Sequence, residues 1–457
     1  MIPNPHVFRE YDIRGVAERD FPDAFVELLG RALGTFWARR GAARVALGRD
    51  CRLSSPRLHA ALLRGLVRTG LEVRDVGMVP TPLLYFTVFH FDLDGGVQIT
   101  GSHNPPEDNG FKIMVGKATL SGADIAELRA MIERGDLEDR AGGSVVPLDP
   151  APAYVGFVRG NIRLSPSDGR TKPRFAIDAG SGAGGPLALA ALRAVGLEPI
   201  ALLCDPDGHF PVHHPDPSLP ENLELLVSTV REHALDLGIA LDGDADRIGV
   251  VDRHGRVVFG DKLLVLLARD VLAKRPGAAI LGEVKCSQVL YDDIEKRGGR
   301  AILWKTGHSL IKKKMKEEAA LLAGEMSGHV FFADRFFGFD DAIYASLRLL
   351  EFLTHSGRRI DELLADLPAT FSTPEIRVDC PDDVKFDVVA RVLAHYRSTH
   401  RVIDVDGARV IFPDGAWGLV RASNTQPVLV LRFEAGTAER LAEVRADVEG
   451  AVARARG

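Results

Sequence analysis

A serine stands between a glycine and a histidine in the segment Gln98-Ile99-Thr100-Gly101-Ser102-His103-Asn104-Pro105-Pro106. A short apolar run leads into this serine and two prolines follow it, so we expect a rigid turn that presents the Ser102 hydroxyl. His103 is the adjacent base, although its side chain need not face the same way as the serine. Taken alone, a Ser-His pair is more typical of an ordinary loop, so its meaning depends on what else the chain offers.

Three aspartates, Asp242, Asp244 and Asp246, alternate directly after the apolar segment 237–241. Carboxylates this close together repel one another, so either water solvates them on an exposed turn or a cation neutralises them. Ligands at the carboxyl end of a strand lie where α/β proteins place their sites, and hard oxygen ligands favour Mg²⁺. An EF-hand loop is excluded because Arg247 and Arg253 occupy its glycine and glutamate positions. We therefore expect a magnesium site.

Two further polar segments lie downstream. Glu325, Ser327 and His329 alternate in a glycine-bounded loop, which suits recognition of sugar hydroxyls but also fits a polar surface turn. Arg421 precedes the run Ser423, Asn424 and Thr425. Short hydrogen-bonding side chains beside a guanidinium suit an anion, whereas a helix cap or turn cluster is the simpler alternative.

Together these four segments indicate chemistry on phosphate. No GxSxG elbow occurs in the sequence, so Ser102 does not have the setting of a typical hydrolase nucleophile. A phosphorylated Ser102 would supply both oxygen ligands for Mg²⁺ and the transferable group itself. The segment 180–185 matches GxGxxG, but glycines are common in tight strand-to-helix turns and no clear ribose-binding acid follows. We therefore do not expect a dinucleotide.

The composition of the chain narrows the range of partners. Its 457 residues carry 57 basic and 63 acidic side chains, for a net charge of -6, which gives no overall attraction to nucleic acid or to an anionic membrane. The four cysteines are far apart and show no metal or redox spacing, so free thiols are expected. The amino terminus lacks the pattern of a signal peptide and no segment has the length of an apolar membrane span. We expect a cytoplasmic protein.

Alternating helix and strand patterns predict an α/β protein of about four units. Asp23 is expected to cap a helix that stops at Gly41, and Ser54 or Ser55 is expected to open a second helix that ends near Gly70. Further helices are expected at 186–195 and 344–354, and a proline-rich stretch at 147–152 is expected to link two units. Strands are expected at 44–48, 71–76, 96–100, 174–178, 197–203, 237–241, 278–281, 376–379, 402–405 and 428–433.

The four polar segments, in this order and spread over the whole chain, resemble the phosphoserine, metal, sugar and phosphate loops of the α-D-phosphohexomutases. The amino-acid sequences of the segments 8–15, 282–285 and 324–329 are most similar to those of the bacterial bifunctional phosphomannomutase/phosphoglucomutase subfamily. Phosphoglucosamine mutases are similar but usually carry a different sugar loop and a glycine where Ala245 stands. The resemblance implies three related α/β domains with mixed sheets and a smaller, mobile C-terminal α+β domain around a central cleft. We place their boundaries at 1–148, 149–252, 253–367 and 368–457.

The resemblance also implies roles for individual residues. Ser102 would be phosphorylated in the resting enzyme and would hold Mg²⁺ together with Asp242, Asp244 and Asp246. Arg247 would neutralise the transferring group, Lys112 and His329 match the proton-transfer candidates, and His103 stands beside the serine. The residues expected to bind substrate are Tyr11, Arg14, Lys285, His308, Glu325, Ser327, Arg421, Ser423, Asn424 and Thr425.

The expected reaction is a reversible transfer of phosphoryl between the 1- and 6-positions of mannose and glucose phosphates, through a 1,6-bisphosphate. Glucose 1,6-bisphosphate is expected as an activator and hexose phosphates as the only partners, with the protein acting as a monomer. Two alternatives remain: a phosphoglucosamine mutase, and a metal-dependent phosphomonoesterase that passes the phosphoryl group to water.

Overall fold

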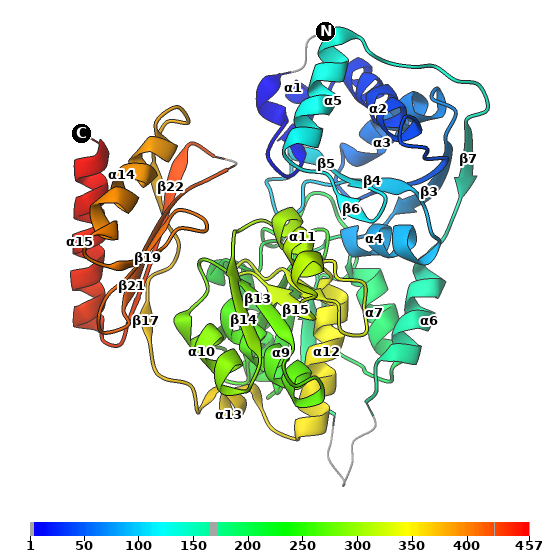
Figure 1. Ribbon diagram of the computed structural model, residues 1–457. Helices are drawn as coiled ribbons and strands as arrows, with labels where there is room; N and C mark the ends of the chain where they lie inside the picture. Colours follow the sequence, from blue (N-terminus) through cyan, green and yellow to red (C-terminus); the bar gives the residue numbers. More distant parts are fainter. Residues whose placement is uncertain (1–3, 165–171, 425, 457) are drawn as a thin grey trace.

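The structure, a computed structural model, describes residues 4–164, 172–424 and 426–456. Within these ranges the strands form four sheets that follow one another along the chain (Figure 1). Three of them are mixed sheets with helices packed on them, and the last belongs to a smaller domain at one side of the molecule. The predicted α/β class, with a smaller C-terminal α+β domain, is therefore confirmed.

The first sheet has the strand order β1-β5-β4-β2-β3-β7, with β6 paired to β5. β2, β3, β4 and β7 run parallel, whereas β5 runs antiparallel to both of its neighbours. Its strands are β1 (Ile13–Val16), β2 (Arg44–Arg49), β3 (Glu72–Met78), β4 (Gly95–Ile99), β5 (Asp108–Val115), β6 (Ala118–Thr119) and β7 (Ser144–Pro147). The carboxyl ends of β2 and β4 lie side by side because these strands pair in parallel, which brings the segments after Arg49 and Ile99 together.

The helices of the first domain cover this sheet. Helices α2 and α3 pack closely against each other, since Gly30 and Gly65 at their crossing leave no room for a side chain. The helix α2 begins at Asp23 itself, with Pro22 in the capping position and no side-chain cap, so the predicted Asp23 cap is wrong. The helices are η1 (Pro5–Val7), α1 (Ala17–Asp20), α2 (Asp23–Ala38), α3 (Ser55–Val67), α4 (Thr81–His90) and α5 (Ala123–Arg134).

The second sheet has the order β12-β11-β10-β8-β9, and the third β14-β13-β15-β16. In each, a parallel set ends in an antiparallel strand, β11 or β16, and the turn into that strand carries one of the polar loops. Their strands are β8 (Phe175–Asp178), β9 (Ile200–Leu202), β10 (Leu237–Leu241), β11 (Ile248–Asp252), β12 (Val257–Val258), β13 (Ala279–Glu283), β14 (Arg300–Trp304), β15 (Leu322–Gly324) and β16 (Val330–Phe332). Their helices are α6 (Ala151–Asn161), α7 (Gly185–Ala194), η2 (Pro220–Leu223), α8 (Glu224–Glu232), α9 (Gly260–Lys274), α10 (Gln288–Lys296), α11 (His308–Glu318), α12 (Ala342–Ser356) and α13 (Ile360–Leu364).

One hydrophobic core spans the first three domains. It includes Phe86 on α4, Tyr154 on α6, Leu264 on α9 and Tyr344 on α12, all buried. Because removing apolar area from water is the dominant stabilising contribution in folding, a shared core fixes these domains relative to one another. The polar loops that these domains carry are therefore held at set positions.

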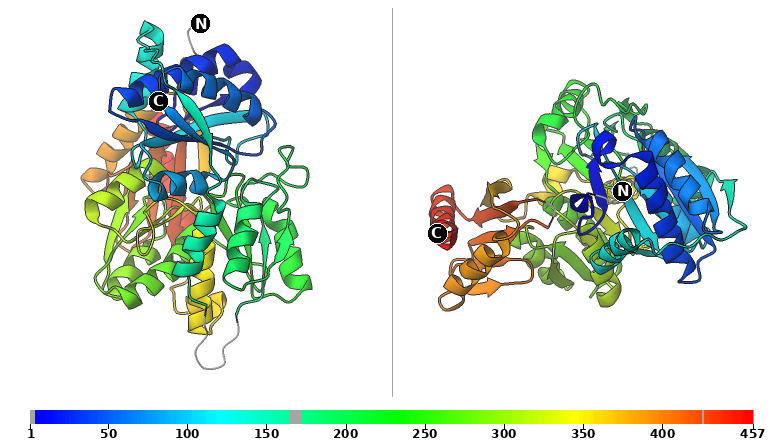
Figure 2. Two further views of the ribbon diagram at one scale, coloured as in Figure 1. Left: turned by 90° about the vertical axis from the view of Figure 1, so that its right-hand side faces the viewer. Right: turned by 90° about the horizontal axis from the view of Figure 1, so that it is seen from above.

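The C-terminal domain has a core of its own and an antiparallel sheet in the order β17-β22-β21-β20-β19, with β18 also paired to β22. It stands to one side of the other three domains, with α14 and α15 on its outer face (Figures 1 and 2). It meets the third domain through the buried Trp417 and Leu419, which pack on Val284. Its elements are β17 (Phe371–Ser372), β18 (Ile376–Asp379), α14 (Lys385–Arg397), β19 (Arg401–Ile403), β20 (Ala408–Ile411), β21 (Trp417–Ala422), β22 (Val428–Ala435) and α15 (Ala438–Arg456).

In the described ranges, no helix combines the length and the apolar composition that a bilayer crossing would require. The proline-rich stretch expected as a linker is short in the structure, because β7 extends to Pro147 and α6 begins at Ala151. The domain boundaries drawn from the sequence stay a prediction.

Candidate active site

Ser102 lies in a tight turn after β4, with its backbone in the left-handed region at a φ of 51°. Such a conformation costs a non-glycine residue on the order of 1–3 kcal/mol, so the surroundings must hold it. The Thr100 hydroxyl does so by accepting a hydrogen bond from the Ser102 amide over 2.8 Å. The buried Ser102 hydroxyl lies 2.8 Å from Asp242 Oδ2 and 3.0 Å from His103 Nδ1. The turn therefore presents the serine oxygen to a carboxylate and to the imidazole of His103, which does face it.

The three aspartates lie on the turn between β10 and β11, all buried and with their ligand atoms within 4.8 Å of one another. Asp242 Oδ1 accepts hydrogen bonds from the amides of Asp246 and Arg247, each over 3.0 Å. Among the described atoms, Asp244 Oδ1 is buried with no hydrogen-bond partner. Burial, together with Asp246 and Asp244, raises the pKa of the Asp242 carboxyl well above its usual range. Buried oxygen donors that repel one another fit a divalent cation such as Mg²⁺.

Glycines allow the metal loop to approach its neighbours closely. At Gly243, a side chain would collide with the Ser102 carbonyl oxygen, so only glycine fits between the metal loop and the serine turn. Gly182 is packed in the same way against Gly243, whose carbonyl accepts a 3.0 Å hydrogen bond from the Ala183 amide. Gly182, the middle glycine of the segment that matches a dinucleotide pattern, therefore packs against the metal loop.

Lys112 lies on β5, where it pairs with Gln98 of β4, and its ammonium reaches the metal loop. Its Nζ lies 2.7 Å from Asp244 Oδ2 and also forms an ion pair with Asp246 Oδ2. Burial lowers the pKa of Lys112, but these two aspartates raise it well above its usual value. At the start of α4, the Thr81 amide and hydroxyl donate to the backbone and carboxylate of Asp244. The first domain therefore contacts the metal loop through two separate elements.

The sugar loop lies between β15 and β16 and is joined to the metal loop through the backbone. Arg247 and His329 form an isolated antiparallel bridge, and the Ile248 amide donates to the Gly328 carbonyl over 3.0 Å. Gly328 has a φ of 93°, and a side chain there would collide with the Ile248 carbonyl. These backbone contacts fix His329 relative to the metal loop.

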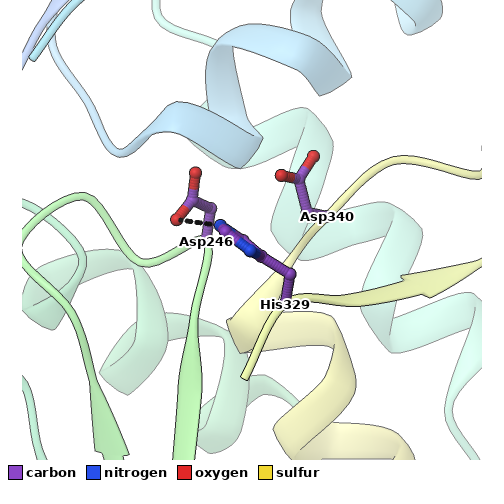
Figure 3. A group of neighbouring side chains, drawn as sticks. All are labelled: Asp246, His329 and Asp340. Carbon is purple, nitrogen blue, oxygen red and sulfur yellow. Dashed lines mark ion pairs between the residues drawn. The ribbon is translucent and has the colours of Figure 1, made fainter. Parts of the chain in front are cut away.

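His329 is buried among charged groups (Figure 3). Its Nε2 lies 3.3 Å from Asp246 Oδ1 and 3.4 Å from Arg247 Nε, and its Nδ1 lies 2.8 Å from Glu325 Oε2. Ser327 Oγ lies 3.2 Å from the same Nδ1. Burial lowers the pKa of His329, but Asp246 and the hydrogen bonds to Asp246 and Glu325 raise it to about 9. The ring is therefore an imidazolium at neutral pH.

His308 lies at the start of α11, with its ring centroid 5.9 Å from that of His329. Its Nδ1 lies 3.7 Å from Asp340 Oδ2, while Lys312 Nζ lies 3.0 Å from Asp340 Oδ1. Burial, with Lys312 and Lys112 close by, lowers the pKa of His308 well below its usual value, so this imidazole is neutral. Asp340 also lies beside Asp246 and His329 (Figure 3). The neutral imidazole of His308 and the charged imidazole of His329 therefore both lie near the Asp340 carboxylate.

The phosphate loop between β21 and β22 reaches the first and third domains. Asn424 Nδ2 donates to the Tyr11 hydroxyl over 2.6 Å, and this hydroxyl lies 3.2 Å from the Thr306 carbonyl. Arg421 forms a 2.9 Å ion pair with Asp406, whose carboxylate also accepts a hydrogen bond from the Thr306 amide. Ser423 is buried on the same loop, and the predicted Thr425 lies outside the described residues.

Two more predicted residues are held by carboxylates. Lys285 lies 3.0 Å from Glu375, on the chain segment that enters the C-terminal domain. Arg14 lies 2.7 Å from Asp12 and donates to Asn104 Oδ1 over 2.9 Å, within the serine segment. The structure thus joins the serine, metal and sugar loops by direct contacts, and it joins the phosphate loop to them through Tyr11 and the segment before His308.

Several buried residues that hold these loops were not predicted from the sequence. Glu283 accepts hydrogen bonds from the Lys285 amide, the Thr306 hydroxyl and the Met326 amide, and so joins three segments of the third domain. Asp340 and Arg52 were also not identified. Glu283 is the last residue of β13, and Arg52 follows the end of β2. Polar residues at the carboxyl ends of parallel strands are often functional, so this position was the available signal.

Comparisons with known proteins agree with this arrangement. Residues 5–139, 152–255, 259–371 and 375–451 match, respectively, alpha/beta/alpha domains I, II and III and the C-terminal domain of phosphoglucomutase/phosphomannomutase. A protein of Pseudomonas aeruginosa named phosphomannomutase/phosphoglucomutase is 47% identical over 441 residues, which cover 96% of this chain and 94% of that protein. A phosphoglucomutase of Neisseria gonorrhoeae is 46% identical, covering 94% of this chain and 93% of that protein.

A solved structure agrees as well. The crystal structure of a phosphoglucomutase/phosphomannomutase family protein from Burkholderia thailandensis superposes with a TM-score of 0.92 at 40% sequence identity, covering 99% of this chain and 98% of that chain. The resemblance carried by the four loops is thereby confirmed. Because all four domains match in order and the sequence similarity extends over nearly the whole length, the chain belongs to the phosphoglucomutase/phosphomannomutase family.

Proposed function

We propose that this protein interconverts the 1- and 6-phosphates of glucose and of mannose, with Ser102 as the phosphoryl carrier. The observation that carries the proposal is the position of the Ser102 hydroxyl, 2.8 Å from the first of three clustered aspartates. A serine used only for packing would not need three buried carboxylates whose ligand atoms lie within 4.8 Å of one another. A phosphoserine beside a cation site does need them, since its oxygens complete the ligand set.

In the proposed reaction the bond from Ser102 Oγ to phosphorus breaks as phosphorus bonds to a hydroxyl of a hexose phosphate. The hydroxyl gives up its proton, and Ser102 Oγ takes one back, so the first half yields a 1,6-bisphosphate and free serine. The sugar then turns around and returns its other phosphate to Ser102. Glucose 1,6-bisphosphate would thus activate unmodified protein by phosphorylating Ser102.

Asp242, Asp244 and Asp246, with phosphorylated Ser102, would hold Mg²⁺. When bound, the ion would neutralise charge that develops on the transferring group. The chain supplies further positive charge from Arg247 and Lys112, which lie on or beside the same loop. Such electrostatic stabilisation by fixed groups is usually the largest contribution to catalysis.

Lys112 and His329 are the proposed proton-transfer pair. Both are held in the protonated state by carboxylates of the metal loop, with Asp246 common to both. When these carboxylates bind Mg²⁺, they should stabilise the positive charges of Lys112 and His329 less. The pKa values of both groups would then fall, so that either can give up a proton. The His103 imidazole contacts Ser102 Oγ directly. Burial and two arginines lower its pKa well below the usual value, so it is neutral.

The sugar would be read by Glu325 and Ser327, and its non-reacting phosphate by Arg421, Ser423, Asn424 and Thr425. Tyr11, Arg14, Lys285 and His308 would complete the binding surface. No further polar loop is assigned to the hydroxyl at C2, where glucose and mannose differ. A site that hydrogen-bonded one epimer there would reject the other by a large factor, up to roughly 10⁴- to 10⁵-fold. We therefore expect comparable kcat/KM for both sugars.

Steady-state assays on glucose 1-phosphate, mannose 1-phosphate and glucosamine 1-phosphate test this proposal. We expect glucose 1-phosphate and mannose 1-phosphate to be converted to their 6-phosphates with kcat/KM values within about a hundredfold of each other. Robust turnover of glucosamine 1-phosphate would favour the phosphoglucosamine mutase alternative. Release of inorganic phosphate without a 6-phosphate would favour the phosphomonoesterase.

Hexose phosphates are thus the proposed partners. The protein is proposed to act as a monomer in the cytoplasm, without nucleic acid or membrane. Light scattering of the purified protein at working concentration measures its mass in solution, and a dimer mass would contradict the first of these points.

A further inference from the structure

Arg52 is a fully buried arginine whose side chain lies under the serine turn. It follows β2, next to the segment that follows β4, and its exposed fraction is 0%. Its Nη2 donates to the carbonyls of Ser102 over 2.8 Å and of Asn104 over 2.6 Å. Its Nη1 donates to the carbonyls of Asp108, over 2.9 Å, and of Pro105. One guanidinium therefore contacts four backbone carbonyls of the loop that presents Ser102.

The fit between this arginine and the turn is close. At Gly101, a side chain would collide with the Arg52 guanidinium, so the backbone lies directly on the planar group. Asp50 completes the arrangement, because its Oδ2 accepts a 3.1 Å hydrogen bond from the Gly101 amide and lies 3.3 Å from Arg52 Nε. Asp50 Oδ1 also accepts from the Arg52 amide over 2.9 Å. The turn is thus held by a carboxylate at one amide and by a guanidinium at four carbonyls.

The turn needs such support for two reasons. Ser102 adopts a left-handed backbone, which is costly for a residue with a side chain. The buried Ser102 carbonyl also needs a hydrogen-bond partner, because an unpaired buried carbonyl costs about 1–3 kcal/mol. Arg52 satisfies the carbonyls and thereby stabilises the one conformation that presents the Ser102 hydroxyl to Asp242.

A loop of the second domain covers Arg52. The Phe210 ring lies over the guanidinium, with its centroid 5.2 Å from Cζ, and Phe210 itself has a φ of 50°. Gly208 packs so closely on the Cys51 carbonyl that a side chain there would collide with it. The second domain therefore both supplies the metal loop and seals the arginine that holds the serine turn.

We propose that Arg52 is a positioning residue for phosphoryl transfer, one that fixes the Ser102 oxygen in line with the metal loop. This inference rests on the proposed function. Arginine suits the task because its planar group presents five donors in a fixed fork, whereas lysine offers three donors around a single point. A misplacement of the reacting oxygen by about 1 Å can cost on the order of 10² in rate.

The test compares Arg52→Lys and Arg52→Met with Arg348→Lys. Arg348 is a matched control, because its side chain is also fully buried but contacts Asp334 and Asp270 away from the serine turn. We expect both Arg52 variants to lose about 100-fold in kcat with KM for glucose 1-phosphate nearly unchanged. Their Ser102 should gain phosphate more slowly from glucose 1,6-bisphosphate, as followed by intact mass. Arg348→Lys should lower the melting temperature but keep kcat.

A wild-type kcat in Arg52→Lys would overturn the proposal, since it would show that charge alone suffices. An equal loss of kcat in Arg348→Lys would also overturn it, because the effect would then follow from burial in general. If neither Arg52 variant folds, Phe210→Leu takes their place, because it opens the cover and keeps the arginine. A smaller fall in kcat at constant KM is then expected, and an unchanged kcat would refute the role. Absence of mutase activity in the wild-type protein would instead reject the proposed function.

Discussion

Asn424 of the C-terminal domain donates its side-chain amide to the hydroxyl of Tyr11 in the first domain, over 2.6 Å. Burial raises the pKa of Tyr11 to about 12, so this hydroxyl keeps its proton and can donate to the Thr306 carbonyl of the third domain, 3.2 Å away. A single hydroxyl therefore links three domains at the place where the substrate phosphate is proposed to bind.

Replacing Tyr11 by Phe should weaken substrate binding more than turnover. The ring would still pack edge-on against His308, but both hydrogen bonds of the hydroxyl would be lost. At about 0.5–1.5 kcal/mol for each of these two neutral hydrogen bonds, KM for glucose 1-phosphate should rise roughly 5- to 150-fold. Tyr154→Phe is the control, since that hydroxyl bonds Asp341 far along the chain from the phosphate loop. Equal KM values in both variants would mean that Tyr11 does not hold the loop.

Ser102→Ala should abolish phosphoryl transfer without unfolding the protein. We expect mutase activity to fall by roughly 10³-fold or more, as when other catalytic nucleophiles are removed, and no phosphate to be gained from glucose 1,6-bisphosphate. Ser181→Ala is a close control, because Ser181 is a buried serine with a φ of 56° in a strand-end turn of the second domain. Near-wild-type activity in Ser102→Ala would remove this serine from the reaction.

Asp244→Asn should weaken magnesium binding by at least about ten- to hundredfold, the loss that follows when an outer-shell partner of a metal ligand is removed, because a neutral amide replaces an anionic oxygen that is buried without a hydrogen-bond partner. Titration calorimetry with Mg²⁺ measures this directly, apart from any activity. Asp252→Asn, at the far end of β11, changes a buried carboxylate outside the metal loop and should leave the affinity unchanged. Identical magnesium affinities in wild type and Asp244→Asn would place the cation elsewhere.

Asp341 gives the fold a dependence on pH. Its carboxylate accepts hydrogen bonds from the Tyr344 amide and the Tyr154 hydroxyl, each over 2.8 Å, and burial raises its pKa to about 7. Since the unfolded value is about 3.9, the folded state binds more protons between roughly pH 4 and pH 7. Stability should therefore fall as pH rises through this window, by at most about 1.4 kcal/mol per pH unit.

Asp341→Asn keeps a good helix cap for α12 but removes the titrating proton. Calorimetric melting temperatures from pH 4.5 to 7.5 should decline more steeply in the wild type than in this variant. Parallel curves would show that the carboxyl has an ordinary pKa.

Local sequence patterns were sufficient for the four polar loops, because each loop is a contiguous run at the end of a strand. The segments 100–106 and 242–247 follow β4 and β10 in the structure as the strand patterns indicated. The helix cap at Asp23 failed because Pro22 already has the extended backbone of a capping position. Strand β5, which carries Lys112, was not predicted, since its polar start, Asp108 and Asn109, obscures the apolar alternation.

Residues that act between distant segments could not be found in this way. Glu283 is buried by packing among three segments, and its three hydrogen-bond donors come from different parts of the third domain. The contact between Tyr11 and Asn424 joins positions 413 residues apart, so only the assembled domains bring them together. Such contacts depend on how the domains pack against one another rather than on any short pattern.

The backbone bridge between Arg247 and His329, with the tight approach at Gly328, allows side chains of the sugar loop to change without moving His329 relative to the metal loop. Main-chain hydrogen bonds hold His329 beside Asp246 whatever side chain stands at position 327. Substitutions at Ser327, the proposed sugar-binding residue, are therefore expected to alter which sugar is accepted while the proposed phosphoryl-transfer groups keep their spacing. A protein built in this way can acquire a new substrate preference by single side-chain changes, without re-optimising its chemistry each time.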